Sequence, residues 1–598
     1  MRAQFHRTLL FCLALPLCCV LLAGAVQGQK PAQGPAPGET RTLTIVATSD
    51  LKGIISTQSA HPGKRAALQS RGLAHLAPVI ARLRAEDPDL LLLDAGDAFV
   101  GSPLMALSEM GWADTGGELP RGIHPQHLMA DALRALRYDA ITLGNRDMAL
   151  GWPMLSALRE RMEMPWLAAN LPPEGDPHAG PPQPFAGHAL FTRKGLRIAV
   201  VGLTTPALGI GLPPESLRGH LPTDLTEATR RQVAHLQATA RPDVIIGLFH
   251  SGLNADYARE EALRAGRARF AGAGEAADTV PGLHLVISGD SHRRGPRGSG
   301  SRGLHDAHHA PTLEPGALGR SLGVARLRLE KHRGEDQGED TPGAWQVVAV
   351  RRETLDAART PDPAIMAMAR PAMDLLRDRL SAPTGLRLRR IPFRHKEFPP
   401  CLGALAHRAI TQAATAQLAT DGAAQYSLVP AGWRFEKPAR AERGRPITRG
   451  HLYRWMPFAE PMLRVMLYPR QAQIMLEGHL RRERGWRVPE GHVLWPGGLF
   501  MEIPTEGSEP GPLRDAATMR LLEPERRHPF WLGSYHWHGG GGMRQQALLP
   551  PAPPMVRVSD APQAVQLKAP LREVLFGYLR APGLPLPDAC TRWLEPIP

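Results

Sequence analysis

Four consecutive leucines, residues 90–93, run directly into an acidic, glycine-broken turn, Asp94-Ala95-Gly96-Asp97. A short and fully apolar run of this kind suits a strand that is buried on both faces of a parallel sheet. Four more apolar, β-rich runs also finish on residues able to bind a metal, which are Asp50, Asn145, His250, Asp290 and His292. Because ligands of open α/β sheets collect beyond the carboxyl ends of the strands, we expect these residues and Asp97 to converge in one crevice.

Helical patterns alternate with these runs along the first part of the chain. The segment 71–86, for example, places Leu73, Leu76 and Ile80 at helical spacing. Such alternation predicts an α/β fold with helices outside the sheet. From about Gly385 the pattern changes to a mixture of helices and strands that predicts an α+β region.

The length of 598 residues exceeds what one ordinary core can organise, so we predict two domains. The first is expected at 42–358 and the second at 385–598, with a linking helix at 359–384 between them. Residues 26–41 are rich in Pro and Gly, and this composition predicts a disordered tether. Residues 1–25 hold an apolar run after Arg2 and Arg7 and end in Ala-Gly-Ala, which predicts a cleaved signal peptide and a periplasmic or secreted protein. The apolar run is too short to span a membrane.

Two cysteines, Cys401 and Cys590, lie outside the predicted signal peptide. In an exported protein they could form one disulfide, and two unpaired thiols are the alternative. The chain is basic, with a formal charge of +14, but its arginines are scattered and no basic run is interleaved with aromatic residues. We therefore expect no nucleic-acid polymer as partner; the charge either draws anionic substrates toward a cleft or reflects compositional bias.

Several motifs resemble those of the 5'-nucleotidase family of calcineurin-like metallophosphoesterases. In chain order they are SDLKG, DAGDAFVGSP, GNRDMALG, FHSG and SGDSH, followed in the second half by GRPITRGHLYRWMPFAE. The resemblance implies a four-layer αββα metallophosphoesterase sandwich followed by an α+β substrate-binding domain. It also implies hydrolysis of phosphomonoesters such as nucleotides, with divalent Mn, Zn or Co as the cofactor. The segments AHLAPVIARLRAE, LRLRRIPF and VPAGWRF are at least as similar to the thiosulfohydrolases of sulfur oxidation.

The resemblance implies two metal positions, and this chain departs from the family at both. One set of ligands corresponds to Asp97, Asn145, His250 and Asp290, where an aspartate replaces a histidine but can still bind a cation. The other set corresponds to Asp50, Asp97 and His292 together with Lys52, which stands where the family has a histidine. A lysine ammonium has no lone pair. We therefore predict one or two bound ions, with the second position lost or weakened and Lys52, paired with Asp50, supplying the missing positive charge.

The catalytic histidine of the family corresponds to Arg146. An arginine there could still bind phosphate oxygens bidentately but could not shuttle protons. We place Arg146, Asp147 and Lys52 as the catalytic candidates.

In the second domain, the resemblance implies that Arg434 and Phe458 bind substrate. Trp537 is the candidate for a second aromatic, with a packed core tryptophan as the alternative reading. The surrounding motifs differ from those of the family here, which puts nucleotide specificity in doubt.

Three functions remain open at this stage. The first is an exported phosphoesterase with altered metal ligands, which the family resemblance favours. A pseudo-enzyme that binds a ligand on this fold ranks close behind. Last is a thiosulfohydrolase-like enzyme that acts on a sulfur ester of a carrier protein.

Overall fold

The computed structural model describes residues 38–57, 71–110, 118–171, 185–208, 214–218, 220–253, 272–297, 309–332, 344–389, 399–418, 426–430, 443–456, 460–483, 494–501, 511–537, 565–581 and 583–597, together with residue 212. The predicted signal peptide, and all of the predicted tether except its last residues, lie outside these ranges. The first strand begins at Thr40, so the last two residues of the predicted tether belong to it. The boundaries proposed for the two domains stay a prediction.

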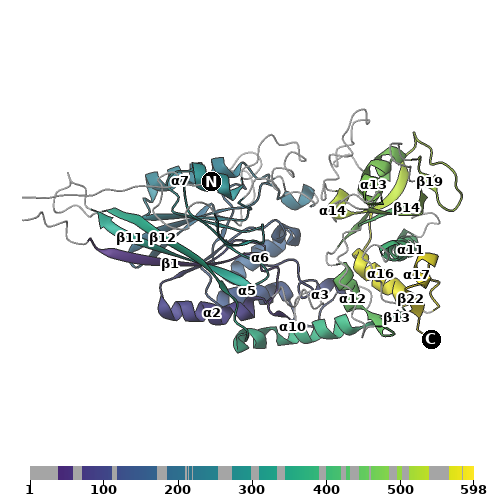
Figure 1. Ribbon diagram of the computed structural model, residues 1–598, viewed down its shortest axis with the longest axis horizontal. Coiled ribbons are helices and arrows are strands. Elements are labelled where there is room, and N and C mark those ends of the chain that lie inside the picture. The colour runs from purple at the N-terminus through teal and green to yellow at the C-terminus, as the bar shows by residue number, and fades with distance from the viewer. Residues whose placement is uncertain are drawn as a thin grey trace, which may run out of the picture. The chain divides into compact units, whose positions relative to one another are not determined.

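Two six-stranded sheets form the first part of the chain (Figure 1). One has the strand order β12-β11-β1-β2-β3-β4 and the other the order β5-β6-β7-β8-β10-β9. The first sheet consists of β1 (Thr40–Thr48), β2 (Leu91–Asp94), β3 (Ala140–Thr142), β4 (Trp166–Leu167), β11 (Ser321–His332) and β12 (Ala344–Asp356). The second consists of β5 (His188–Arg193), β6 (Leu196–Leu203), β7 (Val244–Phe249), β8 (Leu285–Ser288), β9 (Arg294–Arg297) and β10 (Thr312–Pro315). Strands β1 to β4 are parallel to one another, as are β6, β7, β8 and β10.

Helices cover the outer face of each sheet, and Figure 1 shows α7 and α2 on opposite sides of them. The first sheet packs against α2 (Leu73–Glu86), α5 (Pro125–Ala135), α6 (Trp152–Met162) and α10 (Pro363–Ser381). The second packs against α7 (Leu225–Thr239) and α9 (Ala273–Thr279). Between the sheets, apolar side chains from both inner faces share one core. The predicted four-layer αββα sandwich is therefore confirmed.

The leucine run of β2 explains how this sandwich is built. Successive side chains of a strand point to opposite faces. Leu92 accordingly packs in the core beneath the helices, whereas Leu91 and Leu93 pack in the core between the sheets. All three side chains have no exposed surface. A strand in this central position is buried on both faces, which explains the run of three leucines before the buried Asp94 at its end.

The second part of the chain mixes helices with smaller sheets. One sheet has the order β15-β13-β22, another the order β17-β14-β20-β16-β21, and β18 pairs with β19. The strands are β13 (Pro383–Leu388), β14 (Tyr426–Pro430), β15 (Pro446–Thr448), β16 (Met462–Leu467), β17 (Leu494–Gly497), β18 (Leu499–Phe500), β19 (Arg514–Asp515), β20 (His528–Gly533), β21 (Val565–Gln566) and β22 (Leu594–Pro596). The helices are α11 (Pro399–Leu418), α12 (Arg449–Trp455), α13 (Pro469–Glu483), α14 (Ser534–Trp537), α16 (Leu571–Leu579) and α17 (Asp588–Thr591). This arrangement confirms the predicted α+β character.

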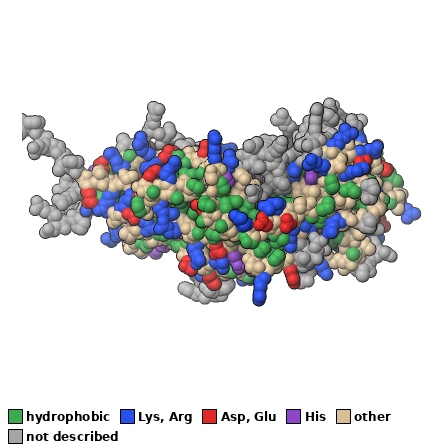
Figure 2. Space-filling model, turned by 90° about the horizontal axis from the view of Figure 1, so that it is seen from below, with side chains coloured by type: hydrophobic (Ala, Val, Ile, Leu, Met, Phe, Trp, Pro, Cys, Tyr) green, Lys and Arg blue, Asp and Glu red, His purple; other side chains and the backbone are tan. Residues whose placement is uncertain are grey.

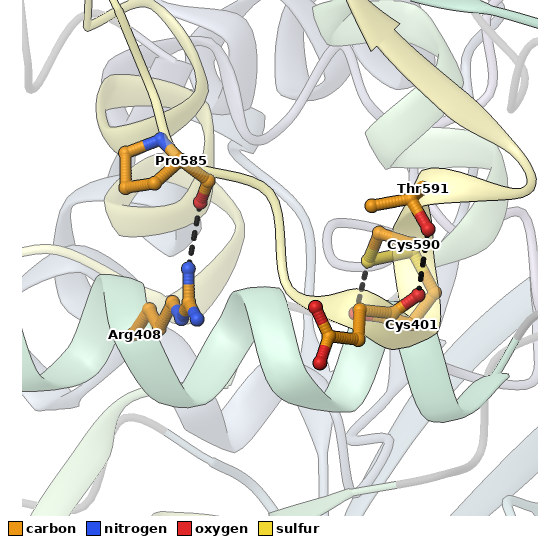
Figure 3. The surroundings of a disulfide bond; sticks show 6 residues. Cys401, Arg408, Pro585, Cys590 and Thr591 are labelled. Carbon is orange, nitrogen blue, oxygen red and sulfur yellow. Dashed lines mark hydrogen bonds between the residues drawn. A yellow bond between two sulfur atoms is a disulfide. The ribbon is translucent and has the colours of Figure 1, made fainter.

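Cys401 in α11 and Cys590 in α17 form a disulfide (Figure 3). Their Cα atoms are 4.7 Å apart, and both residues are fully buried. Nearby, the Arg408 guanidinium donates a hydrogen bond of 2.6 Å to the carbonyl of Pro585. The pairing, which the sequence left open, therefore joins two segments 189 residues apart.

Charged side chains of both signs lie on one face of the molecule (Figure 2). On the face drawn in Figure 2, Lys and Arg side chains are interrupted by acidic and hydrophobic ones. Among the described helices, none is long and apolar enough to cross a membrane.

Candidate metal centre

The residues that end the predicted strands converge, and they come from both sheets. Asp50 and Asp97 follow β1 and β2, and His250 and Asp290 follow β7 and β8. Three of these residues have positive φ angles, 53° at Asp50, 58° at Asp97 and 67° at Asp290. Residues other than glycine rarely adopt this left-handed conformation, and it persists where the surrounding structure enforces it. The turns thus hold a strained backbone that directs these side chains toward one another.

Lys52 forms ion pairs with two aspartates. Its Nζ atom lies 2.9 Å from Asp50 Oδ1 and also donates to Asp97 Oδ2. The side chain of Lys52 is 8% exposed, and those of the two aspartates are buried. The predicted pairing with Asp50 is present, and the pairing with Asp97 is an addition that the sequence did not reveal.

The two turns that carry these residues are linked through their backbones. The amide of Asp50 donates to the carbonyl of Gly96 at 2.9 Å, and the amide of Lys52 donates to the carbonyl of Asp97, also at 2.9 Å. Lys52 itself has a φ angle of 54°. These two hydrogen bonds fix the backbone of Lys52 against the turn that carries Asp97.

His250 stands at the centre of the second group of donors. Its Nδ1 atom lies 2.7 Å from the carbonyl of Ala95, which requires that this nitrogen carries the proton. The Nε2 atom faces three oxygens, at 3.3 Å from Asn145 Oδ1, 3.6 Å from Asp97 Oδ1 and 3.8 Å from Asp290 Oδ1. A metal-binding imidazole is commonly oriented by such a bond from its other nitrogen.

Electrostatics favours the charged forms of Lys52, Asp50 and His250. Burial by itself lowers the pKa of Lys52, but the carboxylates of Asp97 and Asp50 outweigh this effect and raise it. For Asp50, burial acts to raise the pKa, yet Lys52 and His292 bring it well below its ordinary value. Burial likewise lowers the pKa of His250, but Asp97, Asp50 and Asp290 raise it overall. The imidazole is therefore placed where negative charge attracts a proton or a cation.

Asp147, predicted to be catalytic, makes contacts of another kind. Its buried carboxylate accepts hydrogen bonds from the backbone amides of Asp97 at 2.8 Å, Phe99 at 3.0 Å and Gly144 at 3.2 Å. These bonds tie the turn after β2 to the turn after β3. The contacts fit a residue that positions Asp97, and its catalytic role stays a prediction.

Gly144 permits the close approach of these two turns. A Cβ atom at this position would lie 2.2 Å from Asp97 Oδ1 and 2.3 Å from the backbone nitrogen of Asp97. Contacts this short do not occur between real Cβ atoms and backbone, so any side chain would displace Asp97. The sequence predicted neither the requirement for glycine at this position nor the hydrogen bonds of Asp147 to the backbone amides. The GNRD motif contained both residues, but nothing in the spacing showed which groups they contact.

Two side chains, those of Arg146 and His292, lie at the solvent-exposed edge of the cluster. Arg146, whose side chain is 41% exposed, has its Nε atom 3.7 Å from Asp97 Oδ2. His292, with a side chain 47% exposed, has its Nε2 atom 3.2 Å from Asp50 Oδ1. Both residues are thus at the site as predicted, within reach of a ligand from solvent.

The candidate metal ligands form two groups that share Asp97 and His250 and differ in how far their oxygens are already engaged. Asp50, Asp97 and His250 each offer one ligand atom within 4.8 Å of the others. Both oxygens of Asp50 are already engaged, however: Oδ1 by Lys52 and His292, and Oδ2 by the Ser49 hydroxyl at 2.6 Å and the Asp290 amide at 2.9 Å. The donors around His250 Nε2 have no ammonium between them. They are the group whose chemistry suits a divalent cation.

The predicted substrate-binding residues are only partly described. Arg434 and Phe458 lie outside the described residues. Trp537, in α14, is partly buried and packs against the apolar core formed around β14, β16 and β20. This packing agrees with the alternative interpretation that Trp537 is a core residue, and its role in binding substrate stays a prediction.

The four-layer sandwich, with candidate metal ligands beyond its strand ends, has the fold of the calcineurin-like metallophosphoesterases. No protein-family model matches the chain. In sequence it is 26% identical to the trifunctional nucleotide phosphoesterase protein YfkN of Bacillus subtilis, over 51% of this chain and 21% of that protein. It is 24% identical to a 2',3'-cyclic-nucleotide 2'-phosphodiesterase/3'-nucleotidase of Haemophilus influenzae, over 57% of this chain and 51% of that protein. The chain therefore spans from about a fifth to about half the length of these curated relatives.

Solved structures with both parts of the fold are also similar. A proposed 5'-nucleotidase of Staphylococcus aureus matches with a TM-score of 0.62 and 16% identity, over 91% of this chain and 98% of that chain. A 5'-nucleotidase precursor of Thermus thermophilus matches with a TM-score of 0.56 and 19% identity, over 90% of this chain and 96% of that chain. The resemblance predicted from the motifs is thereby confirmed, and the chain has the two-part fold of these 5'-nucleotidase structures.

Proposed function

We propose that this protein is a metal-dependent phosphoester hydrolase that acts on phosphomonoesters such as nucleotides. The observation that carries the proposal is the convergence of Asp97, Asn145, His250 and Asp290 around one point beyond the carboxyl ends of strands from both sheets. The activities for which the sequence relatives are named, nucleotide phosphoesterase and 3'-nucleotidase, support the substrate class.

The chemistry divides between the cation and the side chains of the chain. A divalent cation in such a site lowers the pKa of a coordinated water and stabilises charge on the phosphoryl oxygens. Lys52 offsets the charge of Asp50 and Asp97, so that an anionic substrate is not repelled from the crevice. Arg146, at the exposed edge, is placed to bind two phosphate oxygens with its planar guanidinium.

Proton transfer distinguishes this site from one with a catalytic histidine. The guanidinium of Arg146 does not release a proton near neutral pH. The leaving alkoxide therefore has to take its proton from a group other than Arg146 or from solvent. We expect turnover to be slow for substrates with poor leaving groups and faster for aryl phosphates, whose leaving groups need no protonation.

For the second part of the chain, we propose that it binds the nucleoside portion of the substrate through Arg434, Phe458 and Trp537. The sequence resemblance supports this assignment. For location, we propose export of the chain by the segment 1–25. The buried disulfide between Cys401 and Cys590 supports an oxidising compartment, since such bonds are rare in the cytosol.

The test is hydrolysis after controlled loading with metal. Purified protein is stripped with EDTA, dialysed, and assayed with AMP and p-nitrophenyl phosphate after addition of Mn²⁺, Co²⁺, Zn²⁺ or Mg²⁺. We expect metal-dependent release of phosphate, with loss of most activity in Asp97→Asn and wild-type rates in Asp89→Asn, a matched change at an exposed aspartate. If no cation restores hydrolysis of either substrate, the proposal fails and a ligand-binding pseudo-enzyme remains. The sulfur-ester reaction is not proposed, since nothing in the described part of the chain favours it.

A further inference from the structure

Lys52 occupies a position at which a cation would otherwise be needed. Its Nζ atom contacts Asp50 Oδ1 and Asp97 Oδ2, which belong to two buried carboxylates. Two buried carboxylates this close are unfavourable unless a positive charge neutralises them. Since the ammonium already does so, a metal ion entering between these two oxygens would have to displace it against the electrostatic attraction of both aspartates.

The remaining donors lie around His250 and share Asp97 with the ion pairs of Lys52. The carboxylate of Asp97 points Oδ2 at Lys52 and Oδ1 toward His250 Nε2, at 3.6 Å. Around that nitrogen lie Asn145 Oδ1 and Asp290 Oδ1. The donor set is thus three oxygens and one imidazole nitrogen. Carboxylate and carbonyl oxygens suit Mg²⁺ and Mn²⁺, whereas sites richer in imidazole suit Zn²⁺.

Charge balance agrees with a single ion. The carboxylates of Asp50, Asp97 and Asp290 together with the Lys52 ammonium give the cluster a formal charge of −2, which one divalent cation cancels. A second divalent cation would leave the buried group with net positive charge, next to the guanidinium of Arg146. Burying uncompensated charge is costly.

We propose that this site binds one hard divalent cation, Mn²⁺ or Mg²⁺, through Asp97, Asn145, His250 and Asp290, and that Lys52 permanently takes the place of a second ion. This inference deepens the proposed function, because it defines the metal content of the same site. Its failure is separable from a failure of the proposed function, since metal content is measured without any substrate.

The experiment counts metal ions in the folded protein. Wild-type protein is equilibrated with Mn²⁺, freed of unbound metal by gel filtration and analysed by elemental mass spectrometry, and we expect about one equivalent. Lys52→His supplies a neutral nitrogen donor beside Asp50, Asp97 and His292, and we expect it to bind about two equivalents. Lys568→His, which places a histidine on an exposed lysine position, is the control and stays at the wild-type value.

Spectroscopy gives a second readout that does not depend on activity. The electron paramagnetic resonance spectrum of wild-type protein loaded with Mn²⁺ is expected to show isolated ions, and that of Lys52→His an exchange-coupled pair. A third variant tests the preference for hard cations: in Asp290→His, the ratio of Zn²⁺ affinity to Mn²⁺ affinity is expected to rise relative to wild type. Two coupled ions in wild-type protein would overturn the proposal, as would a single ion in correctly folded Lys52→His. One ion without any hydrolysis would uphold it and refute the proposed function instead.

Discussion

The disulfide between Cys401 and Cys590 leads to a quantitative prediction about stability. The bond closes a loop of 189 residues, and in the chain-entropy model the constraint it places on the unfolded chain grows with the logarithm of loop length. For a loop of this size the model predicts a stabilisation of about 5 kcal/mol at 25 °C. Because both cysteines are fully buried in the same apolar core, the double variant Cys401→Ala/Cys590→Ala also loses sulfur packing there.

Urea unfolding followed by tryptophan fluorescence measures this contribution. Trp455, Trp531 and Trp593 are buried in the core that contains the disulfide, so they report on its unfolding. We expect the transition of this core to shift to lower urea by an amount corresponding to about 5 kcal/mol in the double variant. A strong reductant should lower the urea midpoint of wild-type protein toward that of the double variant. The midpoint of the double variant should not change with the reductant. Equal unfolding transitions for oxidised wild type and double variant would refute the reasoning.

Three further predictions concern buried groups. Replacing Asp147 with Ala leaves three buried backbone amides without their acceptor. We expect urea titration to show a loss of roughly 3–5 kcal/mol in the free energy of unfolding, and calorimetry to show weaker Mn²⁺ binding. Burial raises the pKa of Asp94 from 3.8 to about 7, so the stability that its protonated form contributes is complete below pH 4 and is lost as the pH rises to 7. In urea titrations of metal-free protein, Asp94→Asn should lack this loss, which is of order 4 kcal/mol. If the variant has the same pH profile as wild type, the raised pKa of Asp94 is contradicted. Burial, with Arg408, lowers the pKa of His407 from 6.5 to about 4. The stability that its neutral form contributes is therefore present above pH 6.5 and is lost as the pH falls to 4. In the same titration, the free energy of unfolding of His407→Gln should fall by about 3 kcal/mol less than that of wild type over this range.

Much of the fold followed from local patterns in the sequence. The helix predicted at 71–86 appears as α2 with nearly the same bounds. Alternation of strands and helices, read together with the motif resemblance, led to the correct layers. Short elements with mixed patterns were missed, such as β5 (His188–Arg193), whose side chains are largely half-buried or exposed. An antiparallel edge strand of this kind has no strong apolar run to mark it.

The candidate site was predictable in its membership and not in its contacts. Each of Asp50, Asp97, Asn145, His250 and Asp290 ends an apolar run, and strand ends meet at one edge of a parallel sheet. The sequence could not show that Asp147 accepts three backbone amides, because its partners include residues 48 and 50 positions away along the chain. Nor could it show how Asp97 divides its two oxygens between Lys52 and His250.

The sequence by itself determined the order of strands and helices, the residues at the strand ends and the presence of a lysine among candidate metal ligands. Only the tertiary structure decided that the Lys52 ammonium lies between two carboxylates, and that Cys401 meets Cys590. The physical reason is the same in both cases. Apolar periodicity acts over a few residues and is written in the chain, whereas the position of a charge or a thiol depends on backbone bonds between distant turns, such as the bond from the Lys52 amide to the carbonyl of Asp97.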